Sequence, residues 1–297
     1  MSNHDNKKII PTTKLRNFYG LLRILSTKTQ KAILDDFSRG NNCSKLKDIF
    51  YESRDHFAHY SNITEPFISG IKRKKLPKGF KNISNTNHVT SILEKNKINM
   101  VSSNSNYDFI YLNREVSTIR TSKSKFDTGV SAKSSGLGGL DFIGVTSQKN
   151  NPILGEIKVN NDEDPFFALI QLLTYLSELT TDNQIERINK TKLFKVNIRK
   201  NNKFYLFILF YHNTKLKKGW HDIYNKTKIL SEKLTQSIKE IEEIIFLNMG
   251  ENAAHFEIKE YKNWILTSTA APKKLEAIVL KSLPTQPEYY LILECHL

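Results

Sequence analysis

Residues 136–178 read GLGGLDFIGVTSQKNNPILGEIKVNNDEDPFFALIQLLTYLSE and predict two short strands followed by a helix. The strands, residues 140–145 and 153–159, are apolar runs that a polar turn separates. An amphipathic helix is predicted from Pro165, because proline suits the first helical turn and the acidic residues before it suit the positive end of the helix dipole. Strands interspersed with helices predict a mixed α/β sheet.

The two predicted strands carry a group of charged residues. Successive side chains point to opposite faces of a strand, so Glu156 and Lys158 share one face of the second strand. If the two strands pair, Asp141 on the first strand converges with them. Two carboxylates beside an ammonium at the edge of a sheet can form a Mg²⁺ site for phosphodiester hydrolysis, since Mg²⁺ prefers oxygen ligands.

The order of these elements resembles the PD-(D/E)XK nuclease superfamily, whose core is a helix, three strands, a helix and a strand. The matching residues are Asp141 on one strand and Glu156-Ile157-Lys158 on the next. On the following helix, Gln171 and Tyr175 lie one turn apart and resemble the Gln-x-x-x-Tyr motif of the RecB-like branch. The resemblance covers residues 107–212 and implies a restriction-endonuclease-like fold.

The resemblance implies a metal-dependent nuclease. Asp141, Glu156 and the backbone carbonyl of Ile157 would hold Mg²⁺ or Mn²⁺. Lys158 would position the attacking water or neutralise the charge that develops on the phosphate. The resemblance also implies that Gln171 lies near the metal and that Tyr175 faces the nucleic acid. Stand-alone nucleases of this type often belong to defence or mobile-element systems.

Two further positions bear on the resemblance, one as a candidate match and one as a departure from the signature. Superfamily members often carry a glutamate on the helix before the first core strand, and Glu115 is a candidate metal ligand of this kind. Its segment, NREVSTIRT at residues 113–121, fits a strand as well as a helix. Leu140 stands where the signature has proline, a departure that many members tolerate.

The Glu-x-Lys pattern recurs near the end of the chain, at Glu257-Ile258-Lys259 and at Glu260-Tyr261-Lys262. Neither copy follows an aspartate one hairpin upstream, and neither precedes a helix with a glutamine. Only the copy at Glu156 has the full context, so we expect the other two to be surface pairs.

The net charge of +15 favours a polyanionic partner, most simply nucleic acid. The nuclease resemblance implies DNA in preference to RNA. The first 100 residues hold 19 basic and 8 acidic residues. An AT-rich coding sequence would produce the same excess of lysine without any selection for binding. The basic run IKRKKLPKGFK at residues 71–81 is either a solvated linker or a phosphate-contacting strip, whose candidate residues are Lys72, Arg73, Lys74, Lys75 and Lys78.

The sequence predicts a basic, mainly α-helical region over residues 1–105 and a nuclease domain with a C-terminal α/β extension over residues 106–297. The helices expected outside the central stretch are residues 15–37 (as one helix or two), 44–60 with Ser44 as the N-cap, 90–96 and 224–244. The further strands expected are residues 194–198, 203–211, 245–248, 255–264, 277–280 and 289–293.

Two other functions remain open. Arg54 and His59, in RDHFAHY, resemble the Arg-polar-x-x-x-His motif of HEPN ribonucleases, which cleave RNA without metal and usually across a dimer. The same residues also fit a helix with a surface arginine and a packed histidine. A domain of the nuclease fold that is inactive and only binds nucleic acid is the second alternative. A homodimer is compatible with all of these functions.

The sequence predicts a cytoplasmic protein without a membrane partner. Its longest apolar run, residues 204–211, is too short to span a bilayer, and the N-terminus lacks the apolar segment of a signal peptide. Cys43 and Cys295 alone provide neither a disulfide framework nor a zinc cluster.

Overall fold

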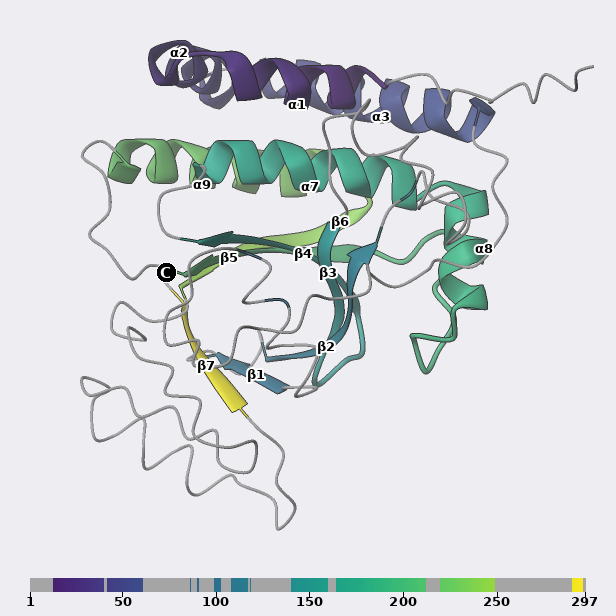
Figure 1. Ribbon diagram of the computed structural model, residues 1–297. Coiled ribbons are helices and arrows are strands. Elements are labelled where there is room, and N and C mark those ends of the chain that lie inside the picture. Colours follow the sequence, from purple (N-terminus) through teal and green to yellow (C-terminus); the bar gives the residue numbers. More distant parts are fainter. Residues whose placement is uncertain are drawn as a thin grey trace, which may run out of the picture.

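The fold is α/β, with helices stacked on a mixed sheet, as the sequence predicts (Figure 1). The computed structural model describes residues 13–39, 42–60, 86, 90, 99–102, 108–116, 118, 140–159, 164–211, 220–248 and 290–295. In Figure 1 the helices α1, α2 and α3 form an outer layer, and α7 and α9 form an inner layer against the sheet. None of the helices in the described ranges is long and apolar enough to cross a bilayer.

Five strands form the body of the sheet, and β4 is at its centre. β2, β3 and β4 are antiparallel neighbours, whereas β4, β5 and β6 are parallel. Parallel neighbours need a crossover, which α7 and α8 provide between β4 and β5, and α9 provides between β5 and β6. The strands are β2 (Phe109–Val116), β3 (Leu140–Thr146), β4 (Pro152–Val159), β5 (Phe204–Tyr211) and β6 (Ile241–Asn248).

Two shorter strands join the edges of this sheet. β1 (Asn99–Ser102) pairs with β2, and β7 (Tyr290–Cys295) pairs with β6. Because β1 and β7 also pair with each other, the order of strands closes on itself. The predicted division near residue 105 stays a prediction, and it falls between the paired strands β1 and β2.

Capping residues set the starts of several helices. The predicted helix over residues 15–37 is two helices, because the Ser26 side chain accepts a hydrogen bond from the Thr29 N–H and starts the second one. Asp164 caps the helix that begins at Pro165 in the same way. The helices are α1 (Lys14–Ile24), α2 (Thr27–Ser38), α3 (Cys43–Tyr60), α7 (Pro165–Leu179), α8 (Asp182–Lys190) and α9 (Trp220–Ser237).

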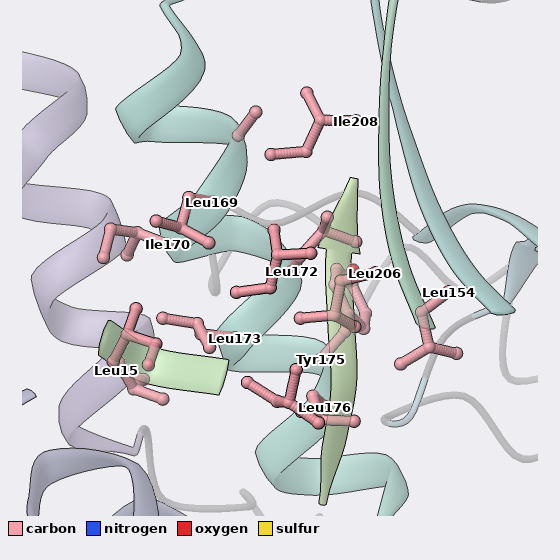
Figure 2. Packing of buried hydrophobic residues seen from close by; sticks show 14 of the residues in the cluster. Leu15, Leu154, Leu169, Ile170, Leu172, Leu173, Tyr175, Leu176, Leu206 and Ile208 are labelled. Atoms are coloured by element: carbon pink, nitrogen blue, oxygen red, sulfur yellow. The ribbon is translucent and has the colours of Figure 1, made fainter. Parts of the chain in front are cut away.

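Helix α7 is buried on every side and is therefore not the amphipathic helix that the sequence predicts. Figure 2 shows it between Leu15 of α1 and the sheet residues Leu154, Leu206 and Ile208. These side chains belong to one hydrophobic cluster, which also includes residues of α2, α3 and α9. Helices α1 and α3 cover the face of α7 that would otherwise meet solvent, so even its polar residues are buried.

Three details of the predicted elements are wrong. Residues 194–198 form no strand: Val196 is exposed, and the Asn189 side chain bonds the backbone of Ile198 in place of a neighbouring strand. The predicted helix over residues 224–244 ends at Ser237, since Ile241 pairs with Phe204 of β5 and starts β6. Ser44 lies inside α3 and does not cap it.

Several other predictions lie outside the described residues. They are the basic run over residues 71–81, the strands over residues 255–264 and 277–280, and both additional Glu-x-Lys copies. Of the fragment over residues 90–96, only Thr90 is described, and it is helical. The strands over residues 203–211, 245–248 and 289–293 are confirmed as parts of β5, β6 and β7.

A buried ion pair fastens α1 to α7. The Arg16 guanidinium donates to both carboxylate oxygens of Glu178, and the exposed fractions of the two side chains are only 3% and 0%. Arg16 Nη2 also donates to Thr118 Oγ1 at 2.9 Å. A pair this deeply buried is sensitive to the loss of either partner, because the remaining charge stays in a medium that solvates it poorly.

We expect Arg16→Met to lower the free energy of unfolding by about 3–5 kcal/mol, because it leaves the Glu178 carboxylate buried and unpaired. The double variant Arg16→Met/Glu178→Leu should recover much of that loss. The matched control is Lys14→Met, which breaks an exposed ion pair with Glu52 and should cost less than about 1 kcal/mol. Urea unfolding measures all three, and equal losses in Arg16→Met and Lys14→Met would contradict the prediction.

Candidate active site

Asp141 and Glu156 meet where β3 and β4 pair. The antiparallel register sets Phe142 opposite Gly155, so the next position along places Asp141 opposite Glu156. Directly opposed side chains share one face of a sheet and lie close together. The convergence of these two carboxylates, which the sequence predicts if the strands pair, is therefore confirmed.

Both backbone polar groups of Ile157 bond to side chains. Its N–H donates to Asp141 Oδ2 at 2.8 Å, and its carbonyl accepts from the Thr86 hydroxyl at 3.1 Å. A carbonyl oxygen has two lone pairs, so the one that Thr86 leaves unused can still bind a ligand. No motif in the sequence marks Thr86, because a single threonine in a polar segment carries no recognisable pattern.

Lys158 connects the strand to helix α7. Its ammonium donates to Glu156 Oε1 at 3.0 Å and to Gln171 Oε1 at 3.1 Å. The same ammonium lies 5.4 Å from the centroid of the Phe167 ring, within the range of a cation–π contact. The alternation of β4 puts Glu156 and Lys158 on the face that carries Leu154, which packs against α7 (Figure 2).

Tyr175 lies one turn beyond Gln171 and deeper in the protein. Its ring is fully buried, and the Arg16 guanidinium lies 5.7 Å from the ring centroid. Burial raises the pKa of the Tyr175 hydroxyl above its ordinary value, so this group stays protonated. The structure brings Gln171 to Lys158 but places Tyr175 beneath α1, so a direct contact with nucleic acid would require this buried ring to move.

The carboxylates sit in an environment that disfavours two negative charges. Burial raises the pKa of Glu156 well above its ordinary value, and the neighbouring Asp141 charge raises it further, while Lys158 acts in the opposite direction. The buried oxygen Oε2 of Glu156 has no N–H or hydroxyl donor within the described part of the chain, and a proton shared with the Asp141 carboxyl would bridge the two groups when no cation is bound. Asp141 is half-buried, whereas Glu156 and Lys158 are buried, so the group meets solvent at Asp141.

This donor set fits a divalent cation. A buried carboxylate oxygen without a donor is the kind of atom that a cation satisfies, and the other candidate ligands, the Asp141 carboxylate and the Ile157 carbonyl, are also oxygens. Mg²⁺ usually binds one or two carboxylates and keeps several waters. The described ranges contain no cluster of three or more His, Cys, Asp or Glu side chains that could hold a metal, so the fit rests on two carboxylates.

The remaining predicted residues lie away from this cluster or are not described. Glu115 lies on strand β2 and not on a helix, and its role as a ligand stays a prediction. Arg54 Nη1 pairs with Glu240 Oε1 at 2.6 Å, and its guanidinium lies over the Tyr51 ring. His59 is exposed near the end of the same helix. Outside the described ranges lie Lys72, Arg73, Lys74, Lys75 and Lys78.

The chain matches no family model, no curated protein and no solved structure.

We expect the stabilisation of the protein by Mg²⁺ to increase with pH. Because the folded state raises the pKa of Glu156, it favours the protonated carboxyl, and the metal-free protein loses stability as pH rises from the ordinary carboxyl pKa through the raised one. Mg²⁺ held by this pair would require both carboxylates to be ionised, and its binding should restore that loss. The increase in melting temperature on adding Mg²⁺, followed from about pH 5 to about pH 8, measures the effect.

Two variants test whether the Mg²⁺ effect comes from Glu156. Glu156→Gln should lose the Mg²⁺ effect at every pH, whereas Asp182→Asn, which changes an exposed carboxylate, should keep it. A Mg²⁺ effect that is independent of pH, or one that survives in Glu156→Gln, would contradict binding at this pair.

Proposed function

We propose that this chain is a metal-dependent nuclease that hydrolyses phosphodiester bonds in nucleic acid, with DNA preferred over RNA, in the cytoplasm. The observation that carries the proposal is the contact of Lys158 with Glu156 and Gln171, beside an Asp141 carboxylate that lies opposite Glu156. The sequence motif predicts that these four residues belong to one site, although they come from two strands and a helix. An arrangement of the PD-(D/E)XK type accounts for all four.

Each residue has a distinct part in the proposed reaction. Asp141, Glu156 and the Ile157 carbonyl would hold Mg²⁺ or Mn²⁺, which supplies a polarised phosphate and a more acidic bound water. Lys158 has three N–H donors, and its ammonium orients the attacking water or neutralises the charge that develops on the phosphate. Gln171 fixes the ammonium from the side of α7.

The charge of the chain supports a nucleic-acid partner. The net charge is +15, and residues 190–203, between α8 and β5, include six basic residues and no acidic one. All six basic side chains are exposed, and three of them form exposed ion pairs: Lys190 with Glu186, Lys200 with Asp182 and Lys203 with Glu242. This segment projects from the body of the protein below α8 in Figure 1. A basic, exposed segment attracts the phosphate backbone through a term that does not depend on sequence.

The geometry gives less support to the metal-free ribonuclease. Arg54 is held by Glu240 and by the Tyr51 ring, at the point where α3 contacts the start of β6. An arginine with these partners stabilises the packing of α3. We therefore propose Lys158 as the catalytic group. The activity test must also exclude metal-free cleavage of RNA.

We expect the wild-type protein to cleave single- or double-stranded DNA in Mg²⁺ or Mn²⁺ and to lose this activity in EDTA. Lys158→Ala should lower the rate at least about 100-fold, because it removes a charge aimed at the transition state. Glu257→Ala, in the second Glu-x-Lys copy, is the matched control and should keep the wild-type rate. A gel-based cleavage assay with labelled substrates measures all three proteins.

Other outcomes of this assay favour the alternatives. Lys158→Ala that cleaves as fast as the wild type would overturn the proposed mechanism. Tight, salt-sensitive DNA binding without any cleavage would indicate an inactive nucleic-acid-binding domain. Cleavage of RNA in EDTA that disappears in His59→Ala would indicate the metal-free ribonuclease.

A further inference from the structure

Tyr19 of helix α1 reaches the candidate active site from the N-terminal part of the chain. Its hydroxyl lies 3.3 Å from Gln171 Oε1, and its ring centroid lies 4.4 Å from that of Phe167. The side chain is buried, with 4% of its surface exposed, so it touches neither solvent nor substrate directly. No motif in the sequence indicates such a contact, since Gln171 follows Tyr19 by 152 positions in the chain.

The Gln171 side chain receives two donors at one oxygen. Lys158 Nζ donates to Gln171 Oε1 at 3.1 Å, and the Tyr19 hydroxyl donates to the same atom. The Lys158 ammonium can only donate, so it determines that the oxygen end of the carboxamide faces it. The Tyr19 hydroxyl bonds the same oxygen from helix α1 and so restrains its position. Without that hydroxyl the Gln171 oxygen would lose its described link to α1.

Tyr19 also supports Lys158 through an aromatic ring. The Phe167 ring, against which Tyr19 packs, faces the Lys158 ammonium at 5.4 Å. The ammonium therefore has three described neighbours, the Glu156 carboxylate, the Gln171 amide and the Phe167 ring. Tyr19 contacts two of these three, and it does so from a helix that the Arg16–Glu178 ion pair holds in place.

From these contacts we infer that Tyr19 is a positioning residue of the active site. It orients Gln171, and through Gln171 and Phe167 it keeps the Lys158 ammonium beside the carboxylate pair. Helix α1 is then an integral part of the active site, in addition to any role of the N-terminal region in holding substrate. The expected effect of Tyr19 on catalysis rests on the proposed nuclease function. The contacts of Tyr19 can be tested without catalysis.

Steady-state kinetics of DNA cleavage test the catalytic consequence. Tyr19→Phe removes only the hydroxyl, and we expect it to lower kcat about tenfold, the effect of one lost hydrogen bond, and to leave KM unchanged because the residue is remote from substrate. Tyr51→Phe is the matched control: it removes a tyrosine hydroxyl that bonds Glu240 elsewhere in the helical layer, and it should keep the wild-type kcat.

A double-variant comparison separates positioning from a general loss of stability. In a Gln171→Leu background, Tyr19→Phe should have no further effect on kcat, since the amide through which the hydroxyl acts is gone. An equal loss of kcat in both backgrounds, or an unchanged kcat in Tyr19→Phe alone, would overturn the inference.

The side-chain amide resonance of Gln171 provides a readout that does not need activity. This ¹H–¹⁵N signal can be assigned by its absence in Gln171→Leu, and we expect it to shift in Tyr19→Phe but not in Tyr51→Phe. If the wild type cleaves no substrate, the proposed function fails and this spectrum alone decides the positioning role. A Gln171 signal that is the same in Tyr19→Phe and in the wild type would overturn that role.

Discussion

Burial of helix α7 on all sides is the constraint on which the rest of the structure depends. All of its side chains are buried and most are apolar, so a sheet beneath it leaves a face that must still be covered. Helices α1 and α3 pack on that face and complete a single hydrophobic cluster. The N-terminal helices are therefore needed to bury the helix that the central motif provides.

The same constraint explains where the polar residues of α7 find partners. Gln171 and Glu178 are buried with the rest of the helix, and a buried polar group without a partner is costly. Gln171 bonds Lys158 of the sheet and Tyr19 of α1, while Glu178 pairs with Arg16. A polar seam thus runs from the carboxylates through α7 to α1, inside a layer that is otherwise apolar.

The pattern of apolar residues along the chain predicted the helices and strands correctly where tertiary burial and strand pairing favoured the same element. Strands β3 and β4 follow directly from their apolar runs, and the start of α7 follows from Pro165. The pattern failed at Ile241 and Ile244, whose spacing fits a helix, because pairing with β5 decided in favour of a strand. It also failed at residues 194–198, where the apolar alternation fits a strand. There the Asn189 side chain bonds the backbone of Ile198, and none of the described strands pairs with the segment.

The sequence by itself determined the α/β class, the strands at residues 140–145 and 153–159, and the shared strand face of Glu156 and Lys158, because apolar runs and alternation depend only on near neighbours in the chain. It could not determine that Tyr19 bonds Gln171, that Thr86 bonds Ile157, or that Arg16 pairs with Glu178. These contacts join residues far apart in the chain, and no local periodicity reports them. Only the tertiary structure decided them: α1 packs over a helix that had to be buried on both faces, which sets the Tyr19 and Arg16 contacts, and Thr86 reaches β4 from a separate segment of the chain.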